Sequence, residues 1–124
     1  MAIPILKQGN YLIASIQSAV ADADLVRLRE DLAEQVGDLH ARGVIVDVTA
    51  VDVMDSFTIR TLLDIAYIDR LRGAEAVIVG IQPDVAFAMV QLGLRLEGVA
   101  TALDLEEGLA YLDGEAKDRR GDGE

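Results

Sequence analysis

The chain has 124 residues, 52% of them hydrophobic, and it carries a formal net charge of −11 at pH 7. That length fits one compact domain, and the low aromatic content of 4% means that Val, Ile, Leu and Ala must build its core. The absence of cysteine excludes disulfide bonds, thiolate nucleophiles and cysteine-ligated metals.

The first two expected elements are strands at residues 3–7 and 11–16, separated by a turn at residues 8–10. This spacing favours an antiparallel hairpin, and Pro4 places its first strand at the edge of a sheet. A helix is expected next, at residues 22–43, because Leu and Val recur there at helical spacing.

Both ends of this first helix carry candidate capping residues. Asp22 or Asp24 can cap its start, and Gly43 can end it. The single histidine, His40, lies near the end, where the helix dipole favours positive charge. One histidine without cysteine makes a poor zinc site, so we interpret His40 as a surface residue of the helix end and expect no metal.

The second half of the chain alternates strands with helices. Residues 44–48 and 76–81, "VIVDV" and "AVIVGI", are nearly continuous apolar runs, which are typical of strands buried on both faces. The other expected elements are helices at residues 56–72, 83–93 and 104–112, and a short loop or weak strand at residues 98–103. We expect residues 113–124 to be a disordered acidic tail.

This order of elements predicts an α/β fold in a single domain that covers residues 1–112. The sheet should be small and mostly parallel, with an antiparallel hairpin at its start and about four helices packed on it. No glycine-rich phosphate-binding fingerprint is present, so we expect no nucleotide or other cofactor.

The charge and the apolar runs also indicate which partners to expect. Phosphate groups attract clusters of Lys and Arg, so a chain this acidic is a poor partner for nucleic acid or for an anionic membrane. Solubility is the simplest reading of the charge, and docking to a basic protein is the alternative. The start "MAIPILKQGN" does not read as a secretory signal, and "AVIVGI" is too short to span a bilayer, so a cytoplasmic location is expected.

The stretch "VTAVDVMDSFTIR" joins a buried strand to a helix and concentrates polar residues. Asp55 or Ser56 can cap that helix, and capping alone accounts for these residue types. A hydrolase nucleophile at Ser56 would need a neighbouring base, but the histidine lies on another helix and no nucleophile-elbow motif is present. Asp52 and Asp55 are close enough in sequence for acid–base work, yet so short a chain offers no pocket-forming insertion. We therefore expect no enzymatic activity.

The position of Ser56 favours a role beyond capping. In parallel α/β sheets, functional groups gather beyond the carboxyl ends of the strands. A phosphate on Ser56 would gain from the positive end of the helix, and Arg60, one turn on, could reach it. The same phosphate would face Asp47, Asp52 and Asp55 and would change which partner surface can dock.

The stretch "VIVDVTAVDVMDSFTIRTLLDIA" resembles the core of STAS domains, the sulfate-transporter and anti-sigma-factor-antagonist fold. The stretches "IPILKQGNYLIASIQ", "GIQPDVAFAMVQLG" and "TALDLEEGL" resemble the small single-domain scaffold of the bacterial stressosome, so the likeness covers about residues 3–112. Among the proteins that this stretch resembles, many anti-sigma antagonists have Asp-Ser-Ser-Gly or Asp-Ser-Thr-Gly at the position of Asp55-Ser56. Here Phe57 and Thr58 follow the serine, which fits the stressosome type better.

The resemblance implies a scaffold that is a substrate rather than an enzyme. Such a protein would hold a serine/threonine switch kinase of the GHKL type and would assemble with itself and with larger STAS-domain sensor subunits. Phosphorylation of Ser56 would release the kinase into a stress-response cascade, and a PP2C-type phosphatase would reverse the mark. Thr58 is a less favoured acceptor. The expected partner-binding residues surround this serine: Asp47, Asp52, Asp55, Phe57 and Arg60.

Three other readings stay open on the sequence. The chain could be a free anti-sigma factor antagonist that binds an anti-sigma kinase as a small complex. It could be an enzyme with Ser56 as nucleophile, or an interaction domain without phosphorylation. The turn at Gln82, Pro83 and Asp84 is a second candidate contact surface, because it should lie at the same end of the sheet as Ser56.

Overall fold

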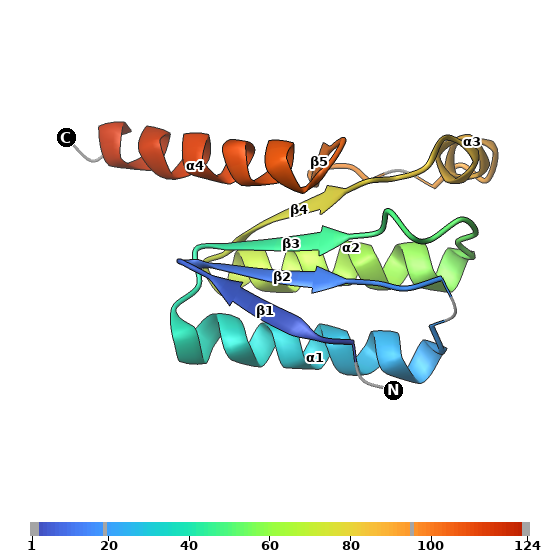
Figure 1. The fold of residues 1–124 in the computed structure, drawn as a ribbon, viewed down its shortest axis with the longest axis horizontal. Helices are drawn as coiled ribbons and strands as arrows, with labels where there is room; N and C mark the ends of the chain where they lie inside the picture. Colours follow the sequence, from blue (N-terminus) through green and yellow to red (C-terminus); the bar gives the residue numbers. More distant parts are fainter. Residues whose placement is uncertain (1–2, 19, 95, 123–124) are drawn as a thin grey trace.

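A computed structural model of the protein describes residues 3–18, 20–94 and 96–122. Five strands form one sheet in the order β1-β2-β3-β4-β5 (Figure 1). The strands are β1 (Ile5–Gln8), β2 (Tyr11–Ser15), β3 (Gly43–Asp47), β4 (Glu75–Val79) and β5 (Ala100–Ala102). The helices are α1 (Asp22–Leu39), α2 (Ser56–Leu71), α3 (Pro83–Gln91) and α4 (Leu105–Asp122).

The pairing of the strands confirms the predicted α/β arrangement. β1 pairs with β2 antiparallel, whereas β2, β3, β4 and β5 pair in parallel along the sheet. β3 and β4 are buried along most of their length, as their continuous apolar sequences predicted. The weak strand expected near residue 100 is β5, which is three residues long.

The helices divide the molecule into layers. α1 and α2 cover one face of the sheet, α4 covers the other, and α3 lies beyond the carboxyl ends of the parallel strands (Figure 1). α1 faces the larger core with a stripe of apolar residues at helical spacing: Leu25, Leu28, Leu32 and Val36. Burying each such side chain contributes roughly 1.5–3 kcal/mol, so this stripe holds α1 on the sheet.

The ends of α1 differ from the sequence expectation. The helix begins after Ala21, which makes no side-chain cap, so neither Asp22 nor Asp24 is the capping residue. It ends at His40, whose left-handed backbone (φ 50°) closes the helix three residues before Gly43. His40 is exposed, as expected of a helix-end residue.

Gly43 instead opens β3, and its lack of a side chain is required by packing. A Cβ at Gly43 would lie 2.7 Å from Leu112 Cδ1 and 3.0 Å from Tyr11 Cδ1. Leu112 itself is buried in the smaller core that α4 forms with the second face of the sheet. Gly43, which the sequence had suggested as the end of the first helix, therefore allows α4 to approach the sheet.

α4 extends further than the sequence predicted. The domain was expected to end at residue 112 and to be followed by a disordered tail, but α4 continues to Asp122. The hydroxyl of Tyr11 donates to Asp113 Oδ1 at 2.5 Å, just past the expected boundary. Glu, Ala, Lys and Arg in this segment have high helix propensity, which explains how the helix continues beyond its buried part. Residues 123–124 of the expected tail lie outside the described residues.

Polar contacts join the C-terminal ends of α1 and α2. Arg72 Nε donates to the Ala33 carbonyl at 2.7 Å, and its guanidinium occupies the space beside Gly37. Asp69, one turn before Arg72, is 0% exposed, and both of its carboxylate oxygens are without a hydrogen-bond partner among the described residues. Burial raises the pKa of Asp69 to about 7, although the charge of Arg72 opposes this effect.

Candidate functional site at the start of α2

The loop between β3 and α2 carries the residues that the sequence singled out. It leaves the carboxyl end of β3 and returns into α2 at Ser56 (Figure 1). Val51 and Met54 are buried and anchor the loop on the larger core. Asp52 and Val53 lie between these anchors and are exposed, Val53 to 78%.

Asp55 is the residue that caps α2. Its extended backbone precedes the helix, and its Oδ1 accepts a hydrogen bond from the Thr58 N–H at 2.8 Å. This bond to the backbone of Thr58 is the main reason why the pKa of Asp55 lies below its ordinary value. The choice between Asp55 and Ser56 as cap, left open by the sequence, is therefore settled in favour of Asp55.

Ser56 is consequently the first helical residue and lies at the positive end of α2. Its side chain is exposed, whereas Thr58 is half-buried. Arg60 is also exposed and follows Ser56 by four residues, so the two side chains share one face of α2. Phe57 is 38% exposed and adds apolar surface next to the serine.

The three aspartates near Ser56 do not have the same role. Asp47 ends β3, is half-buried, and its Oδ1 accepts hydrogen bonds from the Thr49 N–H at 2.9 Å and from Thr49 Oγ1 at 2.6 Å. Asp52 and Asp55 are exposed in the loop. The expected acidic rim is therefore present at Asp52 and Asp55, while Asp47 is bonded within the loop.

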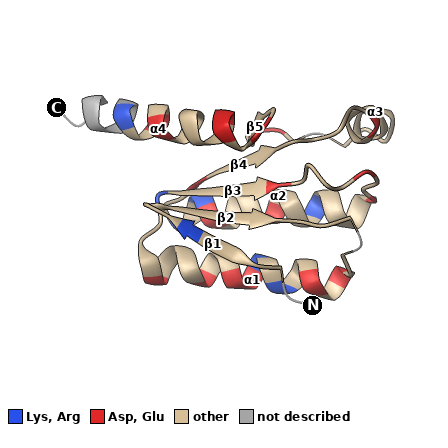
Figure 2. Cartoon of the chain, viewed as in Figure 1, with Lys and Arg blue, Asp and Glu red and all other residues tan. Residues whose placement is uncertain are grey.

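The turn before α3 meets this loop, as the sequence predicted for a second surface at the same end of the sheet. Gln82, the residue before α3, donates from Nε2 to the Thr49 carbonyl at 2.6 Å. Pro83 and Asp84 are exposed in the first turn of α3. Asp84 is the one charged residue of α3, and Figure 2 shows the rest of the helix as uncharged.

Val53 is the residue of this site that sequence reasoning missed. Val53 lies between Asp52 and Met54, follows the alternating pattern of the buried Val51, and gives no signal of exposure in the sequence. The loop geometry decides its position, because Val51 and Met54 take the two places against the core. Val53 and Phe57 thus present apolar groups beside the acidic side chains and the exposed Ser56 hydroxyl.

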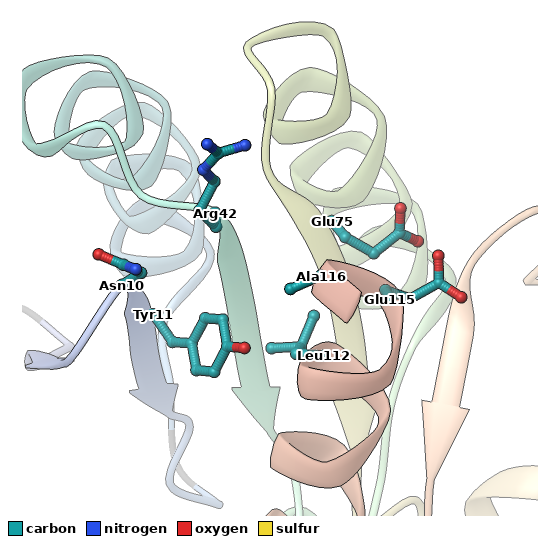
Figure 3. A pocket seen from close by; sticks show the side chains of 7 residues that line it. All are labelled: Asn10, Tyr11, Arg42, Glu75, Leu112, Glu115 and Ala116. Carbon is teal, nitrogen blue, oxygen red and sulfur yellow. The ribbon is translucent and has the colours of Figure 1, made fainter. Parts of the chain in front are cut away.

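A cavity of about 440 Å³ lies at the opposite end of the sheet (Figure 3). It opens between the amino ends of β2, β3 and β4 and the second half of α4, with Arg42 and Glu75 among its lining residues. Figure 3 shows Tyr11 pointing toward Leu112 across it. Ser56 does not line this cavity, and its side chain is exposed at the other end of the sheet.

The described part of the chain offers neither a metal-binding cluster nor a membrane-spanning helix. Within residues 3–18, 20–94 and 96–122, no group of three or more His, Asp or Glu side chains is placed to hold a metal ion. None of the helices described is both long and apolar enough to cross a membrane.

Curated proteins resemble this chain over most of its length. RsbT co-antagonist protein RsbRA of Bacillus subtilis (strain 168) is 27% identical over 107 residues, which are 86% of this chain and 38% of that protein. RsbT co-antagonist protein RsbRD of the same organism is 30% identical over 94 residues, which are 73% of this chain and 34% of that protein. The chain therefore spans little more than a third of the length of these relatives.

Solved structures match it along nearly the whole of both chains. A serine-to-glutamate variant of Moorella thermoacetica RsbS has a TM-score of 0.82 and 34% identity, over 93% of this chain and 97% of that one. A chain of the stressosome, described as a signal integration and transduction hub, has a TM-score of 0.79 and 35% identity, over 91% and 98%.

Unphosphorylated SpoIIAA, an anti-sigma factor antagonist, has a TM-score of 0.73, but at 12% identity it shows a shared fold only. The sequence model of the STAS domain family matches residues 2–108. The chain thus belongs to the STAS domain family and is of the RsbS type within it.

Proposed function

We propose that the protein is a non-enzymatic scaffold of a cytoplasmic stressosome, in which Ser56 is phosphorylated by a partner kinase. One observation supports this most directly. Asp55 supplies the cap of α2, so the Ser56 hydroxyl is left exposed at the first helical position. The likeness to RsbS and to a stressosome chain, at 34% and 35% identity over nearly the full length, supports the same assignment.

Phosphorylation would act through charge at the surface rather than through refolding. A phosphoserine carries about −1.5 to −2 charges at pH 7 and is stabilised at a helix N-terminus. Ser56 lies there already, with Arg60 on the same helix face. The added charge would stand beside Asp52 and Asp55, and a kinase that packs on the uncharged hydroxyl would have to bury this charge without a partner of its own, so it would be released.

The partners follow from the relatives. Several are named as co-antagonists of RsbT, so an RsbT-type protein is the first candidate for the switch kinase of the GHKL type. The matching region is about a third of those relatives, which fits larger sensor proteins that assemble through a related STAS domain. A PP2C-type phosphatase would remove the phosphate.

The decisive experiment maps the modification. The purified chain is incubated with the RsbT-type kinase of its own organism and ATP, and the labelled residue is identified by mass spectrometry. Labelling of Ser56 is expected, with Ser56→Ala unlabelled. Thr58→Ala is the matched control and should be labelled like the natural chain, because Thr58 is half-buried. Labelling only at Thr58 or elsewhere would remove Ser56 from the mechanism.

Particle size separates this proposal from the alternative of a free antagonist. Light scattering of the chain mixed with an RsbR-type relative should show a very large particle if the chain is a stressosome scaffold. A small complex with an anti-sigma kinase, and no large particle, would support the free antagonist instead.

A further inference from the structure

We infer that Gln82 is a positioning residue for Ser56: its side chain braces the loop that presents the serine to the kinase. This inference deepens the proposed function and rests on it. The brace crosses from the end of β4 to the end of β3, two strands that are neighbours in the sheet but 32 residues apart in register.

The first contact is the hydrogen bond from Gln82 Nε2 to the carbonyl of Thr49, at 2.6 Å. Thr49 is the first exposed residue of the loop, and both its N–H and its hydroxyl donate to Asp47 Oδ1. Asp47, Thr49 and Gln82 therefore form one connected network. Through it the start of α3 is tied to the start of the loop that ends at Ser56.

A second contact at the same place is independent of this hydrogen bond. Gly80, two residues before Gln82, has a φ of +82°, and a Cβ there would lie 3.0 Å from Thr49 Cα and would overlap Thr49 Oγ1. The Gly80 N–H donates to the Ala102 carbonyl at 3.1 Å, which fixes this turn to β5. The backbone at Gly80 therefore packs directly on Thr49, and it directs Gln82 toward the Thr49 carbonyl.

The loop depends on such support because its own backbone bonding is sparse. Between Thr49 and Asp55, a hydrogen bond joins the Val51 N–H to the Val48 carbonyl at 2.9 Å, and the side chains of Val51 and Met54 hold the loop to the core. Breaking the Gln82 contact should raise the population of open loop conformations. A kinase that recognises the closed loop would then bind the chain less tightly, in proportion to the lost population.

The test uses Gln82→Met, which keeps the length of the side chain and removes its donor. Gln91→Met, at the exposed last residue of α3, the helix that Gln82 precedes, is the matched control. Amide hydrogen exchange, measured by NMR on the full chain without any partner, should become about three- to tenfold faster at Val51 in Gln82→Met. The helix amides and the whole of the Gln91→Met variant should exchange as in the natural chain.

Phosphorylation kinetics then test the positioning role. In Gln82→Met, KM for the chain should rise by the inverse of the closed-loop fraction that the protection of Val51 reports, with kcat nearly unchanged, because the competent conformation is rarer but reacts normally. Gln82→Lys, which restores a donor, should recover part of the natural KM.

Unchanged exchange at Val51 in Gln82→Met would overturn the brace. A KM that fails to follow the closed-loop fraction reported by Val51, including in variants that lower this fraction severalfold, would overturn the positioning role, since the loop would then be loosened without consequence for the kinase. Failure of the kinase to label even the natural chain would count against the proposed function and hence against the positioning role. In that case the exchange rate of Val51 in Gln82→Met would still decide whether the Gln82 side chain braces the loop.

Discussion

Asp55 and Thr58 are joined across the first turn of α2 by a 2.8 Å hydrogen bond from the Thr58 N–H to the Asp55 carboxylate, and Ser56 lies between them. Because Asp55 makes this bond, capping of the helix does not depend on the hydroxyl of Ser56. Asp55 stabilises the helix start, and the neighbouring hydroxyl needs no part in the helix. A phosphate can therefore be added to Ser56 without removing the cap.

The first prediction concerns this cap. Asp55→Ala should lower the free energy of unfolding by about 1 kcal/mol, the usual effect of losing an N-cap side chain, while Asp55→Asn should lower it much less. The pKa of Asp55 is depressed in the folded chain, so the stability that its charge adds is present above about pH 4 and is lost as the pH falls below that value. Urea unfolding at pH 7 and at pH 3 measures both effects. Equal losses for Ala and Asn at pH 7 would contradict the capping role.

The second prediction concerns the charge of Ser56. Ser56→Asp should weaken binding of the partner kinase by about tenfold or more, because a carboxylate buried at the interface without a partner costs several kcal/mol. Ser56→Ala should bind like the natural chain, since no capping bond is lost. Thr101→Asp adds the same charge on the exposed edge strand β5 and serves as control. Calorimetric titration measures all three, and equal weakening by Thr101→Asp would make the effect one of net charge alone.

The spacing of apolar residues along the sequence was sufficient to predict the hairpin and the order of strands and helices, because this spacing indicates which face of an element is buried. It failed where the deciding contact comes from a distant part of the chain. The sequence suggested that Gly43 ends a helix. In the structure a glycine is required there because Leu112, which lies 69 positions later in the sequence, packs against it. The extension of α4 past that same leucine was missed because the acidic composition of residues 113–124 indicated disorder, although the segment also contains residues of high helix propensity.

The candidate site shows the same division. The position of Ser56 and of the acids around it at a strand end and a helix start was predicted from the sequence, because strand ends and helix starts are local features. The separation of Asp47 from Asp52 and Asp55 depends on the hydroxyl of Thr49, and the approach of Gln82 depends on the order of strands in the sheet. Neither contact has a signature in the residues next to Ser56.

The third prediction concerns Gly80. Gly80→Ala should destabilise the chain by about 1–3 kcal/mol, because its positive φ strains an L-residue and the new Cβ would be pressed against Thr49. Gly73→Ala is the matched control: its φ is +98°, but a Cβ there meets nothing within 4 Å. Thermal unfolding should therefore show a larger loss for Gly80→Ala, and the excess reports the close packing of the two loops. Equal losses would mean that backbone strain alone is responsible.

The fourth prediction concerns the buried Asp69 between α1 and α2. Its pKa is raised to about 7 by burial, against 3.8 for an ordinary aspartate, so the folded chain binds a proton there more tightly than the unfolded chain. The stabilising effect of that proton is complete below about pH 4 and is lost as the pH rises through 7, by at most about 4 kcal/mol in all. Stability should therefore fall between pH 4 and pH 7.

Asp69→Asn cannot ionise and should remove this slope, so that the variant is more stable than the natural chain at pH 8 and similar to it near pH 4. Asp64→Asn is the control on the same helix, since Asp64 is exposed and pairs with Arg29 at 3.4 Å. That pair lies at the surface and contributes little, so the pH profile should be unchanged. Urea unfolding from pH 4 to pH 8 compares the three chains. Parallel profiles for the natural chain and Asp69→Asn would show that Asp69 remains charged throughout, with the guanidinium of Arg72 as the group able to hold it so.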